Sequence, residues 1–386
     1  MIKYSDRILL ADGGTRQALA LAQSFKNLGC FVTALCESHF DNCSLSKNVD
    51  KTIFDKEIQD RPDLRVRSIL KEISNEKYTL VVTSSDYTAE QLSINKKEIE
   101  QYAKVSVVDK DLFYIAFDKL KTMQICMENG IPCPKTYFDC KTVEDVMSKD
   151  LVFPLIIKPR LGYGAIGFHK FDAPSEFREY LSKHSDEIEH LVIQEYIPQT
   201  DIQYEAAMFV DQHNQIKSAM VFEKNRWFPV LGGSSTLNTS IKDAQIVKNC
   251  SRLMQLIQWR GCADIDLIRD PRDGVAKIME VNPRMSASAK IVILSGVNLA
   301  LQLLQMAKGE EVTEYKDYRQ GIRLRCLYTD FLWFLKSKDR FKAKPSWFDF
   351  RKTYEQVFSW KDPLPYLGFS IGSLLKLRKE LKKREE

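Results

Sequence analysis

Two carboxylates and one amide lie at spacings that could bring three oxygen ligands together. Asp266 lies within an apolar, strand-like run, and Glu280 and Asn282 lie in the next such run, after a polar turn. An antiparallel hairpin would place Asp266 opposite Glu280, with Asn282 on the same face because side chains alternate along a strand. Neighbouring carboxylates repel unless a cation neutralises them, and oxygen ligands of this kind suit Mg²⁺. For the two acids alone, a solvated hairpin face is the simpler interpretation.

A cation follows this hairpin in the sequence. Arg284 comes two residues after Asn282, and its forked guanidinium could clamp a phosphoryl group or a substrate carboxylate. Asp264 lies two residues before Asp266, so the same alternation puts it on the same face, as a further ligand or a supporting partner. The arginine favours a chemical site over a solvated surface.

A glycine-rich segment lies earlier in the chain. Gly162, Gly164 and Gly167 match the dinucleotide fingerprint, but the residues after Gly167 read as a short strand that ends before Pro174. The dinucleotide motif must open a helix, so a nicotinamide cofactor is disfavoured. A glycine loop between strands still offers backbone N–H groups to phosphate oxygens, although a plain hairpin turn would also use glycine. Lys158 ends the preceding apolar run, where a buried ammonium needs an anion.

The first part of the chain alternates apolar runs with helical patterns, which predicts a parallel, doubly wound α/β sheet. The strand candidates are 7–11, 31–35, 80–83 and 105–108. Such sheets bind ligands at the carboxyl ends of their strands. The turn Asp12-Gly13-Gly14 lies at that edge, and it is either a substrate contact or a tight strand-to-helix turn.

The middle of the chain shows antiparallel strand patterns, which predict an α+β class. Strands are expected near 155–159, 168–171, 192–197, 205–210 and 216–222, followed by a helix over about 243–258 and the carboxylate hairpin. The expected domains are an α/β domain over residues 1–115, a two-lobed α+β domain over 116–312 and a small C-terminal extension over 313–386.

The composition limits the class of protein. The chain has 386 residues, of which 44% are hydrophobic and 28% charged, as is typical of a soluble globular protein with two or three folding units. No apolar run reaches the length of about 18 residues that spans a membrane, and the N-terminus lacks a signal-peptide pattern, so a cytoplasmic location is expected. The nine cysteines include no CxxC pair, which favours reduced thiols over zinc or disulfides.

Charge is unevenly distributed along the chain. The net charge is +5, whereas residues 319–386, with 17 Lys and Arg against 8 Asp and Glu, carry +9. The remainder is negative, which is not the balance of a nucleic-acid-binding protein. The basic C-terminal segment also contains aromatic runs. It either packs on the body as a subdomain, which we favour, or contacts an anionic membrane surface or a larger complex.

Taken in order, these segments resemble the ATP-grasp superfamily over roughly residues 1–310. Six stretches carry the resemblance: Phe117–Lys119, Ile157–Pro159, Gly162–Gly167, Gln194–Ile197, Asp264–Asp266 and Met279–Arg284. The resemblance implies a pre-ATP-grasp domain followed by a two-lobed nucleotide domain. It also implies ATP and Mg²⁺ as cofactors, with Mn²⁺ as a substitute.

By position, the resemblance divides the candidate residues into three groups. The first group is implied to hold ATP. Lys119 and Lys158 would bind its phosphates, and the loop with Gly162, Gly164 and Gly167 would cover them. Gln194, Glu195 and Ile197 would meet adenine, and Asp201 (or Glu205) would meet the ribose. Those implied to hold the metal are Asp266, Glu280 and Asn282. Those implied to act on the reacting groups are Arg284 and Lys158.

The reaction that the resemblance implies is carboxylate–amine ligation. A carboxylate attacks the γ-phosphate of ATP, and an amine then attacks the acyl-phosphate, so that ADP and phosphate are released. The implied partners are a small-molecule carboxylate and amine, and a homodimer is left open. The alternatives are another ATP-grasp phosphotransfer, carbamoyl-phosphate-type chemistry, or a non-catalytic nucleotide-binding scaffold subunit. The segment with Lys224, Arg226, Ser234 and Ser235 is either an acceptor-substrate surface or a mobile loop.

Overall fold

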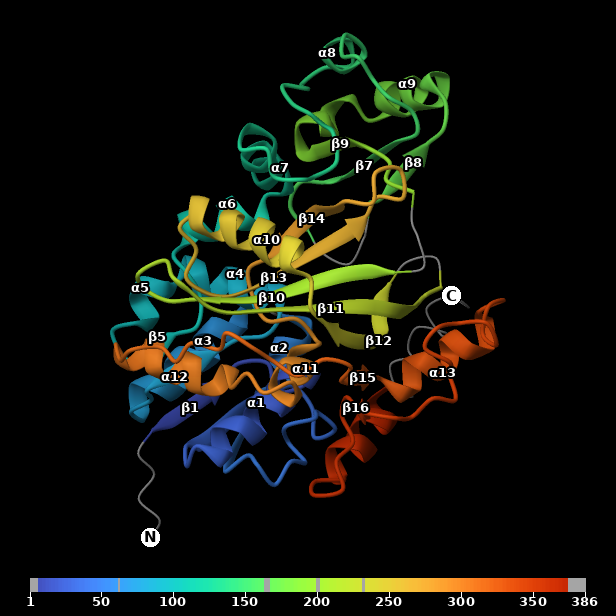
Figure 1. Ribbon diagram of the computed structural model, residues 1–386. Coiled ribbons are helices and arrows are strands. Elements are labelled where there is room, and N and C mark those ends of the chain that lie inside the picture. Colours follow the sequence, from blue (N-terminus) through green and yellow to red (C-terminus); the bar gives the residue numbers. More distant parts are fainter. Residues whose placement is uncertain (1–5, 62, 163–166, 199–201, 231–232, 374–386) are drawn as a thin grey trace, which may run out of the picture.

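Three sheets organise the chain, with helices packed on their faces (Figure 1). The computed structural model describes residues 6–61, 63–162, 167–198, 202–230 and 233–373. The expected fold class is confirmed, because a parallel α/β sheet is followed by a two-lobed α+β unit and a small C-terminal extension. Within the described ranges, no helix is long and apolar enough to cross a membrane.

The first sheet is five-stranded and parallel, in the order β3-β2-β1-β4-β5. Its strands are β1 (Arg7–Leu10), β2 (Phe31–Cys36), β3 (Lys51–Phe54), β4 (Leu80–Val82) and β5 (Lys104–Val105). Its helices are α1 (Arg16–Asn27), α2 (Glu57–Asp60), α3 (Leu64–Asn75), α4 (Asp86–Ile94) and α5 (Lys96–Ile99). Strand β1 is central, and its buried side chains divide between the two faces, with Ile8 and Leu10 in one core and Leu9 in the other. Both faces are therefore covered, as a parallel sheet requires.

Helices α6 (Lys110–Phe117) and α7 (Lys119–Glu128) lead into a smaller antiparallel sheet, in the order β6-β9-β7-β8. Its strands are β6 (Thr136–Tyr137), β7 (Leu155–Pro159), β8 (His169–Phe171) and β9 (Leu191–Glu195). The accompanying helices are α8 (Val143–Met147), α9 (Pro174–Lys183) and the 3₁₀ helix η1 (Ser185–His190). Phe177 and Leu181 lie at the centre of a core that belongs to this lobe alone. The lobe stands apart at the top of Figure 1.

The third sheet has seven strands, in the order β14-β13-β10-β11-β12-β15-β16. The strands are β10 (Gln203–Val210), β11 (Ile216–Phe228), β12 (Ser234–Ile241), β13 (Gly261–Arg269), β14 (Ala276–Asn282), β15 (Arg323–Arg325) and β16 (Thr353–Glu355). The helices are α10 (Ala244–Leu256), α11 (Ala289–Leu294), α12 (Leu299–Lys308) and α13 (Leu327–Lys336). Ile265 and Ile278 share one core with Leu9 and Val81 of the first sheet. This large lobe and the N-terminal domain therefore pack as one body.

The C-terminal residues join the large sheet. Strand β15 pairs with β12, and β16 pairs with β15 in parallel, so the segment extends the sheet at its edge. Helix α13 packs against β11 and β12. The described part of this segment therefore packs on the body as a subdomain, although several of its aromatic side chains, such as Phe348 and Phe350, stay exposed.

Candidate active site

The carboxylate hairpin forms with the predicted register. In the ladder between β13 and β14, Asp266 lies opposite Glu280 and Asp264 lies opposite Asn282. The amide of Asn282 donates to Oδ2 of Asp266 at 3.2 Å. The side chains of Asp266 and Glu280 stay 25% and 31% exposed, so both can still meet a ligand. The structure thus brings the three predicted metal ligands together on one open face.

Two lysines reach this face from the small-lobe side. Nζ of Lys119, the first residue of α7, lies 3.6 Å from Oε2 of Glu280 and donates to the carbonyl of Gly162 at 2.6 Å. Nζ of Lys158, on β7, donates to the carbonyl of Met279 at 3.2 Å. Burial lowers the pKa of Lys158 to about 8, Glu280 raises it in part, and Lys119 lowers it further. Glu280 only partly offsets the burial of Lys158, so a further anion bound beside the two lysines would favour their charged forms.

A second ion-pair group continues the same face toward β10 and β11. Glu205 is almost fully buried on β10, directly opposite Asp266 in the ladder. Nζ of Lys224 lies 2.8 Å from Oε2 of Glu205 and also forms an ion pair with Asp266. Burial alone would lower the pKa of Lys224, but Asp266 and Glu205 hold it well above its usual value. The resemblance implies Glu205 as an alternative ribose ligand, whereas the structure places its side chain in the carboxylate group.

Asp264 lies beneath this group and is 4% exposed. Burial, with the charge of Glu205, raises the pKa of Asp264 well above its usual range. The carboxylate accepts a hydrogen bond from the backbone N–H of Ser286. Asp264 therefore supports the turn after β14 from below, and it is not an open ligand position.

Arg284 turns toward the N-terminal domain. Its Nε and Nη2 donate to the two carboxylate oxygens of Asp86 at 2.7 and 2.8 Å. Asp86 is the first residue of α4, so it lies at the carboxyl end of β4, where a doubly wound sheet binds ligands. A cavity of about 320 Å³ adjoins the pair and is lined by Gln17, Ser84, Ser85, Asp86, Tyr87, Arg284 and Ala287. Asp86 is not among the residues predicted from the sequence, although its position directly after a strand is a usable signal.

The predicted hinge residues lie at the edge of the small sheet. Gln194 is fully buried and its amide donates to Oγ1 of Thr136 at 2.8 Å. Glu195 accepts from the backbone N–H of Lys135 at 2.9 Å and from Nη2 of Arg272 at 2.7 Å. The side chains of Gln194 and Glu195 are thus engaged in holding the strand edge, and Ile197 is buried beside them.

The described residues on either side of the glycine segment belong to antiparallel strands, β7 before it and β8 after it, as predicted. Strands β7 and β8 pair on either side of it. Gly162 and Gly167 have φ of 138° and 75°, where a side chain is strained, and a Cβ on Gly167 would lie 2.9 Å from Pro159. The other predicted loop residue, Gly164, lies outside the described residues, as does Asp201.

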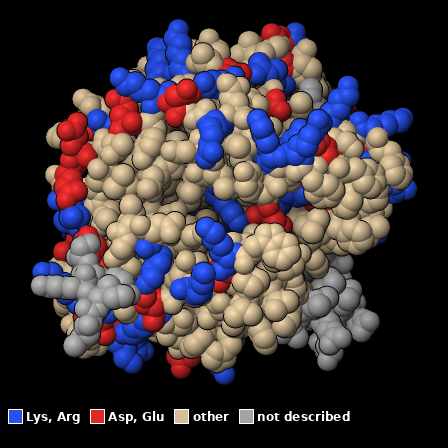
Figure 2. Space-filling view, turned by 60° about the horizontal axis from the view of Figure 1, so that its bottom comes forward, with Lys and Arg blue, Asp and Glu red and all other residues tan. Residues whose placement is uncertain are grey.

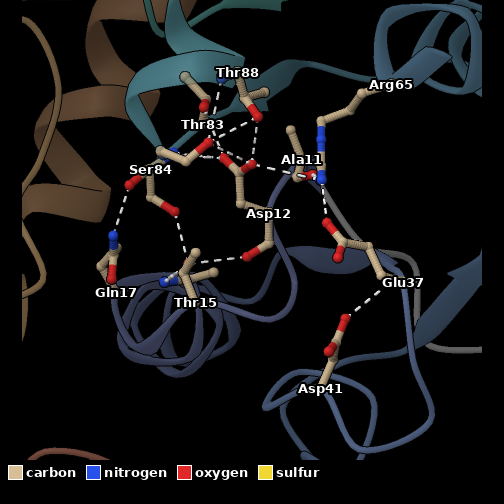
Figure 3. A network of polar contacts seen from close by, with 12 residues as sticks. Ala11, Asp12, Thr15, Gln17, Glu37, Asp41, Arg65, Thr83, Ser84 and Thr88 are labelled. Carbon is tan, nitrogen blue, oxygen red and sulfur yellow. Dashed lines mark hydrogen bonds and ion pairs between the residues drawn. The ribbon is translucent and has the colours of Figure 1, made fainter. Parts of the chain in front are cut away.

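The side chain of Asp12 accepts hydrogen bonds that join two parts of the N-terminal domain (Figure 3). The carboxylate accepts hydrogen bonds from the hydroxyls of Thr83, Ser85 and Thr88 at 2.6 to 2.9 Å, and from the backbone N–H of Ser84 at 2.8 Å. With both oxygens engaged, Asp12 ties the end of β1 to the start of α4. Of the two interpretations, the tight turn is the one that the geometry favours.

Gly13→Ala is expected to lower the free energy of unfolding by about 2 kcal/mol, because the site is already closely packed. A Cβ there would lie 2.4 Å from Sγ of Cys36 and 2.7 Å from the carbonyl oxygen of Leu35. Urea denaturation followed by circular dichroism measures the change. Gly372→Ala is the matched control, since its Cβ meets nothing closer than 3.8 Å. Equal stability of the two variants would contradict the close-packing argument.

Arg226 is not available to a substrate. It is 2% exposed, and its Nε and Nη2 donate to Asp330 at 2.8 and 3.1 Å. The interpretation of this side chain as an acceptor-substrate contact is therefore wrong. Lys224, on the same strand, lies against the carboxylates and keeps its place in the site.

Comparisons with known proteins show which family and fold the chain resembles. The ATP-grasp domain family matches residues 116–288. D-aspartate ligase of Enterococcus faecium is 26% identical over 246 residues, which cover 58% of each chain, so the match spans less than two thirds of that relative. D-alanine–D-alanine ligase of Anaplasma marginale is 34% identical over 92 residues, 23% of this chain and 27% of that one.

Solved structures show the same fold at low sequence identity. Biotin carboxylase of Campylobacter jejuni, in its β,γ-ATP complex, superposes with a TM-score of 0.68 at 15% identity, over 82% of this chain and 74% of that one. An L-amino acid ligase of Bacillus licheniformis superposes with a TM-score of 0.59 at 16% identity, over 79% and 75%. Residues 116–288 of the chain thus match the ATP-grasp domain family, and the match with D-aspartate ligase is a further similarity.

Proposed function

We propose that the chain is an ATP- and Mg²⁺-dependent ligase that joins a carboxylate to an amine through an acyl-phosphate, with release of ADP and phosphate. The observation that carries the proposal is the convergence of Lys119 and Lys158 with Asp266, Glu280 and Asn282 on one face between the lobes. Cations for phosphate and oxygen ligands for a metal are the two parts that phosphoryl transfer requires. The names of the relatives, D-aspartate ligase and D-alanine–D-alanine ligase, support ligation.

The donor set fits Mg²⁺, or Mn²⁺ in its place. Asp266, Glu280 and the amide oxygen of Asn282 would form the set, since the described part of the chain holds no group of three His, Cys, Asp or Glu side chains suited to a metal. Few protein ligands, with phosphate oxygens and water for the rest, are usual for Mg²⁺. When bound, the metal neutralises phosphate oxygens.

The remaining roles follow the order of the lobes. Lys119 and Lys158 bind the phosphates, and the loop with Gly162, Gly164 and Gly167 covers them and excludes water. The backbone around Gln194, Glu195 and Ile197 meets adenine, and Asp201 meets the ribose. These assignments rest on position along the family's fold together with the placement of Lys119 and Lys158 beside Glu280.

We assign amino acids as the class of substrate, because the charged side chains at the cavity between the domains suit them. Arg284 offers a forked cation for a carboxylate, and Asp86 offers an anion for an ammonium group. Because each now neutralises the other, a zwitterion could separate the pair without leaving either charge alone. Three relatives are also named for amino acid substrates.

Nucleotide turnover tests the proposal directly. The purified chain is incubated with Mg·ATP and pooled amino acids, and the nucleotide product is identified. ADP and phosphate that depend on one pool support ligation, and hydroxylamine in place of the amine should trap the acyl-phosphate as a hydroxamate. AMP and pyrophosphate would contradict the proposal. ATP binding without turnover in any pool would favour the scaffold alternative.

Binding of Mg·ATP is expected to take up most of one proton at pH 8.5, because Lys158 is largely neutral there before the phosphates arrive. Its pKa of about 8 means that affinity should fall as the pH rises through 8, whereas at pH 6.5 the ammonium is already charged. Titration calorimetry in buffers of different ionisation enthalpy counts the proton. The Lys158→Met variant should bind weakly and without this uptake. Uptake that persists in the variant would assign the proton to another group.

A further inference from the structure

Apolar side chains are exposed in unusual density near the C-terminus. Of the 19 large hydrophobic side chains that are exposed in the described part of the chain, 10 lie between residues 331 and 371. Scattered single ones are ordinary on a protein surface, but contiguous ones mark an interaction site. The densest group comprises Phe331, Leu335, Phe341, Phe348 and Phe350, here called the aromatic patch.

Ring contacts show that most of the aromatic patch is continuous. The ring of Phe334 lies 5.5 Å from that of Phe341 and 5.8 Å from that of Phe348, measured between centroids. Phe331 and Leu335 are four residues apart on α13, so they share a face of that helix next to Phe334. Phe341 is 72% exposed and Phe348 is 58% exposed. Large rings are therefore held in water around one half-buried ring.

Basic side chains alternate with these rings. Lys338, Lys342 and Lys344 are exposed, and none of them forms an ion pair with any described residue. In Figure 2, blue side chains border a broad tan surface toward the right of the view, the side on which α13 lies in Figure 1. The patch thus combines apolar rings with free ammonium groups.

Hydrogen bonds from side chains beneath it hold the backbone of the loop that carries the patch. Nη1 of Arg226 donates to the carbonyl of Pro345 at 2.8 Å, and Nη1 of Arg325 donates to the carbonyl of Trp347 at 3.1 Å. Nε1 of Trp347 donates to the carbonyl of Asp330 at 3.3 Å. Both arginines are buried. The exposed rings are thus presented on a fixed backbone, which reduces the entropy lost when they bind.

We propose that the aromatic patch docks this protein on an anionic lipid surface. Rings can enter the interfacial layer while lysines meet the anionic head groups, and both contacts favour binding. A protein partner fits the pattern less well, because the cores of protein interfaces are rich in aromatic residues but poor in lysine. The assignment is independent of the reaction proposed above.

Vesicle co-sedimentation of the full chain tests the assignment. Wild-type protein should pellet with phosphatidylcholine vesicles that contain phosphatidylglycerol, less so as salt is raised, and not with phosphatidylcholine alone. Replacing Lys338, Lys342 and Lys344 together with Ala should weaken binding by about 100-fold. Phe341→Ser with Phe348→Ser should weaken it by at least about tenfold. Unchanged circular dichroism and thermal melts show that each variant is folded.

Matched controls separate the patch from general charge and from the end of the chain. Replacing Lys77, Lys97 and Lys110, which are exposed on the N-terminal domain, with Ala should leave binding within about twofold of wild type. A chain that ends at residue 373 should still bind. Loss of binding in either control, or no binding of wild type at low salt, would overturn the assignment. Binding to soluble polyglutamate without binding to vesicles would also overturn it and assign the patch to an acidic protein.

Discussion

Glu280→Gln is expected to reduce ATP turnover by roughly 1,000-fold, the equivalent of about 4 kcal/mol in the barrier. The change keeps the shape of the side chain but removes the charge that lies 3.6 Å from Nζ of Lys119 and that we propose binds the metal. Since the side chain is 31% exposed, the substitution should leave the fold intact. Steady-state ADP release, measured with the amino acid pool that supports wild-type turnover, gives the rate.

Two further measurements separate chemistry from binding. Mn²⁺ titration of the nucleotide complex should show weaker metal binding in Glu280→Gln, because one anionic ligand is lost. Glu223→Gln is the control, since Glu223 is on the same sheet but accepts its hydrogen bond from Asn225 and lies outside the carboxylate group. Turnover of Glu280→Gln within about tenfold of wild type would remove Glu280 from the proposed metal set.

The features that sequence predicted best are those set by short-range geometry. The register of Asp266 opposite Glu280 follows from alternation along two strands joined by a tight turn, and the structure has that register. The strand–loop–strand setting of the glycines follows equally from local pattern, because Pro174 and the apolar run before it exclude a helix at Gly167. Each of these predictions needed only neighbours in the chain.

The features that sequence missed are side-chain pairs between distant segments. Arg284 meets Asp86, 198 residues earlier, and Arg226 meets Asp330, 104 residues later. The residues next to Arg226 in the sequence do not show whether it is a buried structural cation or a substrate contact. Its partner Asp330 lies on α13, which contacts β11 and β12 only in the folded chain. Similarly, Glu205 joins the carboxylate group only because β10 lies next to β13. These side-chain pairs depend on which strands are neighbours in the sheet, and local sequence patterns do not give the strand order.

Asp330→Ala is expected to lower the free energy of unfolding by about 4 kcal/mol, because it leaves buried cations without their counter-charge. Asp330 is fully buried and lies between two guanidinium groups, at 2.8 Å from Nε of Arg226 and 2.6 Å from Nε of Arg325. Its Oδ1 also accepts from Oγ1 of Thr236 at 2.8 Å. Urea denaturation measures the loss, and hydrogen exchange should show it in α13 and the strands β12, β15 and β16.

A second substitution tests the cause of that loss. Adding Arg325→Met to Asp330→Ala should restore part of the stability, because one stranded guanidinium is removed and the pair of changes is not additive. Asp317→Ala, which breaks an exposed ion pair with Lys242, should have no measurable effect. A loss below about 1 kcal/mol in Asp330→Ala would contradict the ion-pair account. Because Arg226 and Arg325 also hold the backbone of the patch loop, the same variant should bind anionic vesicles more weakly while it is still folded.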